Sequence, residues 1–239
     1  MSRLADLTRF YALVDRLRAR QGGPCTLTNM RSFRDCPPRG VYFFFETGED
    51  RRESGGGPRI VRVGTHALTD GSRSTLRQRL AQHRGRVSGG GNHRGSIFRL
   101  LVGQALMARG DQPPCKSWGV KGDLSKASAA LGIERAALAG AEAPVEHAVS
   151  SYIAAMPCLW LEIDDNPGPG SLRGAIERDA IALLSNYCRA PLDAGSPLWL
   201  GQFSDRPLVS GSGLWNQRHV EETRDATFLD VFERLIDQK

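Results

Sequence analysis

Two short apolar segments, each containing a glycine, are followed by a short basic helix, and this order restricts the folds open to the chain. The first segment, residues 40–46, reads Gly-Val-Tyr-Phe-Phe-Phe-Glu and is rich in aromatic residues. The second, residues 59–65, reads Arg-Ile-Val-Arg-Val-Gly-Thr. Both compositions predict strands, and the nearly continuous apolarity of the first predicts burial on both faces. The charged, glycine-rich residues 47–58 between them predict a hairpin loop.

The basic helix covers residues 76–83 and reads Leu-Arg-Gln-Arg-Leu-Ala-Gln-His. Leu76 and Leu80 lie one turn apart and define its buried stripe, while Arg79 and His83 fall on or beside that stripe. A guanidinium that faces the sheet is costly to desolvate unless an anion meets it. That anion is either an internal carboxylate or the phosphate of a ligand, which the planar donor fork of arginine suits.

Helical periodicity marks much of the remaining chain, where apolar residues recur at three- and four-residue steps. A third strand is predicted at residues 159–163, and the glycine-rich segment 85–92 predicts a mobile or groove-facing loop. The predicted helices cover residues 4–20, 96–109, 125–139, 143–156 and 171–187, with a final amphipathic helix around 228–235.

The charge balance favours a polyanionic partner. The 239 residues include 32 Lys and Arg against 26 Asp and Glu, which leaves a formal net charge of +6. Each cationic contact with a phosphate releases condensed counterions, so such an excess favours nucleic acid. The same charge also serves solubility, and it does not decide the function alone.

The cysteines and the hydropathy indicate a soluble protein of the cytoplasm. Five cysteines are scattered along the chain, and no two have the spacing of a zinc knuckle or a redox pair. Such a set predicts reduced thiols. The first residues contain no apolar signal segment, and no run of apolar residues is long enough to cross a membrane. We therefore expect no membrane partner.

Taken in order, the motifs resemble the GIY-YIG nuclease superfamily. There, a Gly-hydrophobic-Tyr strand and a Tyr-hydrophobic-Gly strand precede a helix that carries Leu-Arg-x-Arg-Leu. Residues 40–42 match the first motif and residues 76–80 match the helix, and His83 resembles the partner found one turn later in some restriction enzymes of the superfamily. Two features depart from the pattern. Residues 62–64 read Arg-Val-Gly, without the tyrosine, and the loop at 47–58 is longer than usual.

The resemblance implies an α/β (α+β) fold with a small mixed three-stranded central sheet flanked by helices. All 239 residues would form a single domain. Its expected parts are a catalytic core at 40–84 and 158–216, a helical insertion at 85–157, an N-terminal helical extension at 1–39 and a C-terminal helix at 217–239.

The resemblance also implies a metal site. Glu177, in the predicted helix 171–187, takes the place of the metal-binding glutamate and would hold Mg²⁺ or Mn²⁺. Arg79 would neutralise charge on a phosphate oxygen in the transition state. The asparagine of the superfamily has two candidates: Asn216 has the better local context and is preferred, whereas Asn186 has the better distance along the chain.

Two residues compete as the general base that activates water. Tyr42 is the base that the superfamily uses when the second tyrosine is absent, and a phenol ionises near neutral pH only with positive charge nearby. His83 is either an alternative base or the group that orients Tyr42. Basic side chains that would contact the nucleic acid are Arg62, His66, Arg84 and Arg94, the last at a predicted helix N-terminus.

These features predict a metal-dependent endonuclease that hydrolyses phosphodiester bonds in DNA. One such centre cuts one strand, so a double-strand break would need a homodimer or two binding events. Because the second tyrosine is missing, a weak or inactive member that only binds nucleic acid is the main alternative. A third hypothesis is that the chain is an unrelated α/β protein in which the motifs coincide by chance.

Overall fold

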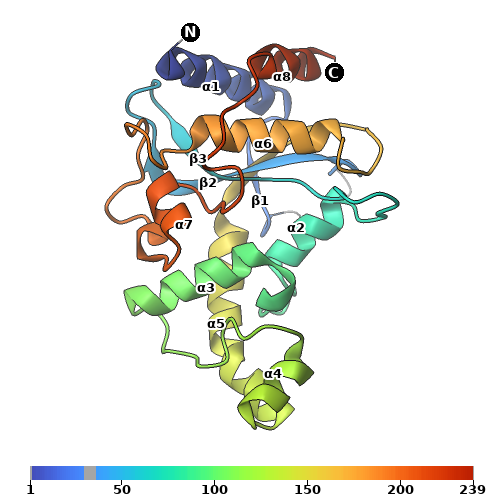
Figure 1. Cartoon of the computed structure of the whole chain (residues 1–239), viewed down its shortest axis with the longest axis vertical. Helices are drawn as coiled ribbons and strands as arrows, with labels where there is room; N and C mark the ends of the chain where they lie inside the picture. The colour runs from blue at the N-terminus through green and yellow to red at the C-terminus, as the bar shows by residue number, and fades with distance from the viewer. Residues whose placement is uncertain (1, 30–35, 239) are drawn as a thin grey trace.

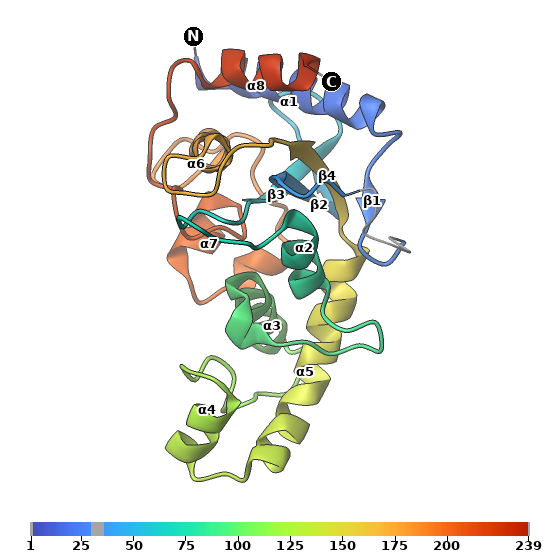
Figure 2. The same cartoon turned by 90° about the vertical axis from the view of Figure 1, so that its right-hand side faces the viewer.

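The structure, a computed structural model, describes residues 2–29 and 36–238. A small sheet crosses the molecule between two layers of helices (Figure 1). Above the sheet lie α1 (Arg3–Arg20), α6 (Leu172–Leu184) and α8 (Phe228–Asp237). Below it the chain extends away from the sheet through the helices of residues 85–157, the predicted insertion, so the molecule is elongated (Figures 1 and 2).

The sheet has four strands in the described part of the chain: β1 (Cys25–Thr26), β2 (Gly40–Asp50), β3 (Pro58–Gly64) and β4 (Pro157–Glu162). Their order is β1-β4-β2-β3, and all three neighbouring pairs are antiparallel. This corrects the expected mixed sheet of three strands. The extra strand, β1, is only two residues long and forms by pairing with β4, so no local periodicity could reveal it.

Strand β2 separates the two layers of the core, because successive side chains point to opposite faces of a sheet. Val41, Phe43 and Phe45 pack with the upper helices. There Phe10 of α1 lies at 6.3 Å from Phe43, measured between ring centroids, and α8 completes the aromatic cluster. Tyr42 and Phe44 point the other way into a second apolar cluster below the sheet.

The lower layer contains α2 (Leu76–Arg84), α3 (Ile97–Arg109), α4 (Leu124–Leu131) and α5 (Arg135–Ala155). The predicted break between two helices near residue 140 is wrong. The break comes earlier, at Gly132, which adopts the left-handed conformation (φ 63°) that ends α4. Helix α5 then runs without interruption through Pro144.

The remaining described chain is short or irregular. Two turns of 3-10 helix, η2 (His93–Gly95) and η3 (Leu200–Phe203), and the short α7 (Pro207–Ser212) connect the longer elements. No helix in the described ranges is both long enough and apolar enough to span a membrane.

Candidate active site

The two motif glycines make room for neighbouring strands at the centre of the sheet. In the β2–β3 pair, Tyr42 lies opposite Gly64. A Cβ atom on Gly64 would overlap the Tyr42 hydroxyl and the ring carbon that bears it. Gly40 is equally restricted, because a Cβ there would overlap the Leu161 carbonyl oxygen of β4. The phenol of Tyr42 therefore lies over the end of β3, where only glycine leaves space for it.

Helix α2 brings His83 to that phenol. The helix starts with a capping box: Thr75 accepts a hydrogen bond from the Gln78 amide (3.2 Å), and the Gln78 side chain accepts one from the Thr75 amide (2.9 Å). At its other end the imidazole of His83 is fully buried. Its Nε2 lies 2.7 Å from the Tyr42 hydroxyl and its Nδ1 lies 3.0 Å from the Ser96 hydroxyl.

The charge state of His83 follows from its surroundings. Burial lowers the pKa of His83 well below its usual value, and the positive charges of Arg79, Arg62 and Arg99 lower it further. The imidazole is therefore neutral at neutral pH. In that form it carries one ring proton and one lone pair.

Arg79 lies half-buried on the same helix. Its guanidinium donates a hydrogen bond to Gln82 Oε1 (2.6 Å). No carboxylate within ion-pair distance of Arg79 is found in the described ranges, so the internal ion pair that the sequence left open is not formed there. Its charge acts on His83, His66 and Glu177, since it lowers the pKa of each.

Arg62 occupies the place of the missing tyrosine and faces the same side of the sheet as Tyr42. The side chain is buried, with its guanidinium 4.6 Å from the centroid of the Phe98 ring. One terminal nitrogen, Nη1, donates to the Trp215 carbonyl at 2.6 Å. Its Nε is buried without a hydrogen-bond partner among the described residues. A buried guanidinium that is this poorly neutralised favours an anion beside it.

Glu177 approaches these cations from the other layer. Helix α6 packs above the sheet, against β2 and the edge strand β3. Burial raises the pKa of the Glu177 carboxyl group. That rise in pKa is opposed by electrostatic interactions with Arg62, His219 and Arg79 and by a hydrogen bond with the Thr65 backbone. The carboxylate is thus within electrostatic reach of both guanidinium groups, near the residue that follows β3.

Asn216 lies along the free edge of β3. Its side chain accepts a hydrogen bond from the Val63 amide (3.1 Å) and donates one to the Val63 carbonyl (2.9 Å). The preceding residue, Trp215, donates its amide to the Val61 carbonyl at 2.7 Å. Asn186 lies elsewhere, where it bonds the Leu192 backbone and Arg3. Of the two candidate asparagines, Asn216 is therefore the one placed against β3.

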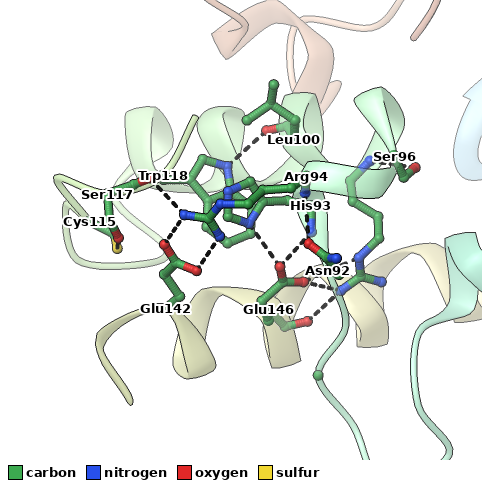
Figure 3. Close-up of polar contacts among 12 residues, drawn as sticks. Asn92, His93, Arg94, Ser96, Leu100, Cys115, Ser117, Trp118, Glu142 and Glu146 are labelled. Atoms are coloured by element: carbon green, nitrogen blue, oxygen red, sulfur yellow. Dashed lines mark hydrogen bonds and ion pairs between the residues drawn. The ribbon is translucent and has the colours of Figure 1, made fainter. Parts of the chain in front are cut away.

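The other predicted nucleic-acid contacts, His66, Arg84 and Arg94, have different surroundings. His66 is buried, and its pKa is lowered to about 4 by desolvation and by Arg173. Arg84 ends α2 and is partly buried. Arg94, expected to contact a phosphate, is partly buried and forms a bidentate ion pair with Glu142, with both N–O distances 2.6 Å (Figure 3).

The sequence analysis did not predict the contact between Ser96 and His83. Ser96 caps α3 by accepting a hydrogen bond from the Arg99 amide (3.4 Å), and it also reaches His83. Its position at the start of a helix could be predicted from the sequence. Its contact with His83 could not, because that contact depends on how residues 85–92 bring the start of α3 back towards α2.

Comparison with known protein families decides the membership of this chain. The model of the GIY-YIG domain family matches residues 1–239. The chain belongs to the GIY-YIG family. Searches of curated proteins and of solved structures gave no significant match. The GIY-YIG family consists in general of endonucleases.

Proposed function

We propose that this GIY-YIG protein is a metal-dependent endonuclease that hydrolyses phosphodiester bonds in DNA at a single-metal site. The observation that carries the proposal is the combination at the end of β3 of a hydrogen-bonded Tyr42–His83 pair, two guanidinium groups and one carboxylate. Arg62 and Arg79 have no carboxylate partner at ion-pair distance in the described ranges, which leaves them available to a phosphate.

The residues present fit a magnesium or manganese ion. In the described part of the chain no three His, Cys, Asp or Glu side chains form a metal cage. Mg²⁺ does not need one, because it keeps several waters and binds through one or two carboxylates together with substrate phosphates. Glu177 is a partly exposed carboxylate whose pKa is raised by burial, so a cation beside it would relieve an unfavourable charge. When bound there, the ion would polarise the phosphate and stabilise the leaving oxygen.

Side chains of the protein would bind the phosphate and activate the water. The guanidinium of Arg79 would bind a non-bridging phosphate oxygen, where negative charge grows as water attacks. Tyr42 and His83 are joined by a direct hydrogen bond, so we assign the activation of water to this pair. The excess of basic residues, a net +6, supports DNA as the substrate.

A plasmid assay tests this proposal. Supercoiled DNA is incubated with the protein and Mg²⁺, and in parallel with EDTA. We expect nicking that EDTA abolishes and that Glu177→Gln and Arg79→Ala each reduce by about 10²-fold or more. The matched controls are Glu221→Gln and Arg77→Ala, which change exposed residues of the same types and should nick normally.

Nicking that persists in EDTA and in Glu177→Gln would overturn the metal-dependent mechanism. Binding of DNA by the wild type without nicking would favour the weak or inactive, binding-only member instead. We further propose that one molecule nicks one strand and that a double-strand break requires a homodimer or two binding events. The five cysteines are free thiols, which supports a reducing compartment such as the cytoplasm.

A further inference from the structure

Two cysteines that are far apart in the sequence lie opposite each other at the edge of the sheet. Strand β1 pairs with β4 (Figure 2) in an antiparallel register that places Cys25 directly across from Cys158. Their Sγ atoms lie 3.6 Å apart, although the two residues are 133 positions apart in the chain. The spacing of the cysteines in the sequence could not pair them, because the contact exists only once β1 joins the sheet.

The backbone geometry of this pair already suits a disulfide bond. Residues opposite each other in antiparallel strands have Cα atoms about 4.5–5.5 Å apart. A disulfide bond needs Cα atoms about 4.4–6.8 Å apart, so the two strands can keep their register. The sulfur atoms have to approach from 3.6 Å to about 2 Å, which rotation of the two side chains can supply.

The two thiols differ in accessibility and in acidity. Cys25 is partly exposed, whereas Cys158 is fully buried. A hydrogen bond from the Cys158 thiol stabilises the Cys25 thiolate and lowers the pKa of Cys25. The same hydrogen bond, together with burial, raises the pKa of Cys158. Because the thiolate is the reactive form, an oxidant that arrives from solvent would react with Cys25 first.

The other three cysteines form no hydrogen bond with a second cysteine in the described chain. Burial raises the pKa of Cys36 to about 12, so its thiol stays protonated. The sulfur of Cys115 lies 3.3 Å from the Ser117 hydroxyl. Cys188 is exposed. The pair at the edge of the sheet is therefore the place where an intramolecular disulfide bond fits.

We propose that Cys25 and Cys158 form a reversible redox site, at which hydrogen peroxide joins them by a disulfide bond that ties β1 to β4. This site is independent of the proposed nuclease activity. Disulfide bonds in reducing compartments are usually transient and often serve to sense oxidants, which suits a pair of thiols that is reduced at rest.

The oxidation has two steps. The Cys25 thiolate attacks one oxygen of the peroxide, the O–O bond breaks and hydroxide leaves, which gives a sulfenic acid at Cys25. The Cys158 sulfur then attacks the Cys25 sulfur, the S–O bond breaks, and the departing hydroxide takes the Cys158 thiol proton to become water. In total the two thiols lose two hydrogens and two electrons, and the peroxide becomes two waters. A thiol reductant reverses the oxidation by thiol–disulfide exchange.

Mass spectrometry of the full chain tests the site. The reduced protein is treated with hydrogen peroxide, its remaining thiols are blocked with iodoacetamide, and it is digested without reductant. We expect two peptides joined through Cys25 and Cys158, which dithiothreitol separates. In Cys158→Ala the sulfenic acid has no partner and should accumulate at Cys25, where dimedone traps it. Cys188→Ser changes an exposed cysteine outside the pair and should form the bond as the wild type does.

A bond from Cys25 to Cys36, a bond between two molecules, or oxidation of Cys188 while Cys25 and Cys158 stay reduced would overturn the proposal.

Urea unfolding measures what the bond does to the fold. A disulfide bond between residues this far apart closes a long loop and restricts the unfolded chain. The midpoint of unfolding should therefore shift to higher urea after oxidation of the wild type, and it should not shift in Cys25→Ser treated in the same way. A midpoint that stays the same or falls in the oxidised wild type would mean that the bond distorts the native pairing, which would contradict the proposed fit.

Discussion

At the scale of single residues, the Glu177 carboxylate lies in surroundings that disfavour its charge. Burial raises its pKa, and the nearby cations only partly compensate. An acid whose pKa is raised in the folded state destabilises that state as the pH rises through this pKa. Such a residue weakens the fold at neutral pH, which is common where a site is organised for a ligand that arrives later.

Glu177→Gln should therefore stabilise the protein while it reduces nicking. We expect the free energy of unfolding at pH 7 to rise by about 1 kcal/mol, because the neutral amide removes the unfavourable charge. Urea unfolding of the variant and the wild type measures the difference. The effect should shrink on acidification, as Glu177 itself becomes protonated. A clear loss of stability at pH 7 would show that the charge is well compensated and would contradict this account.

The close packing of Tyr42 against Gly64 can also be tested by a substitution. Gly64→Ala should lower the free energy of unfolding by about 1–3 kcal/mol, because the added methyl group meets the Tyr42 ring in a packed interior. It should also reduce nicking, because the phenol must move. Gly56→Ala is the matched control, since a Cβ there meets nothing within 4 Å. Equal thermal melting of both variants would refute the packing argument.

Helical periodicity was sufficient to place Arg79 and His83 on one face of the helix. Tyr42 was added to them only through the resemblance to the superfamily, and the structure shows it bonded to His83. The sequence was not sufficient for Ser96, which contacts His83 only after a loop folds back. It also could not show that Arg94 is neutralised by Glu142, since those residues lie on separate elements and meet only in the folded chain.

At the scale of elements, β3 is an edge strand whose free side is covered by residues 215–216. The Trp215 amide and the Asn216 side chain bond Val61 and Val63 much as a neighbouring strand would. This cover protects an otherwise open edge and fixes the end of β3, beside which Glu177 lies. Asn216 thus supports the site through the strand.

Asn216→Ala should loosen β3. Two buried backbone groups of Val63 lose their partner, so we expect the free energy of unfolding to fall by about 2–4 kcal/mol. Hydrogen exchange should accelerate most at the Val63 amide, whereas the Phe43 amide, inside the sheet, serves as the internal control. Uniform acceleration at both amides would mean global destabilisation without a special role for the edge.

The elements themselves were predictable where a local pattern is long. Helices α1, α2, α3, α6 and α8 follow from their apolar stripes, and β2, β3 and β4 from their composition. Strand β1 was not predictable, because its two residues are strand only through their pairing with β4. The local sequence also did not predict that α5 is one continuous helix through Pro144.

At the scale of the whole molecule, the second apolar cluster joins the sheet to the predicted insertion. Tyr42 and Phe44 of the sheet pack in it with Phe98, Val102 and Val149 from α3 and α5. The lower helices are thus part of the core that supports the site. Among the buried histidines of the described chain, burial lowers the pKa of His66 and of His83.

These histidines should make the protein sensitive to mild acid. The pKa of His66 is lowered to about 4 and that of His83 lies well below 6.5, so both stay neutral in the folded state. The unfolded chain binds protons at these residues from about pH 6.5 downward. The free energy of unfolding should therefore fall as the pH drops from 6.5 towards 4, by up to about 1.4 kcal/mol per pH unit for each histidine.

Urea unfolding at several pH values measures this slope. His66→Gln should make it shallower, whereas the same change at the exposed His147 should not. A slope that is unchanged by His66→Gln would mean that His66 is protonated in the folded protein.

The central claim is that Tyr42, Arg79 and Glu177 act on one phosphate. A crystal structure of the Tyr42→Phe variant with duplex DNA and Mg²⁺ tests it most directly. The account predicts one cation at about 2.1 Å from a Glu177 carboxylate oxygen, with a backbone phosphate between that cation and the Arg79 guanidinium. DNA bound on another face, or a cation held elsewhere with Glu177 unligated, would contradict it.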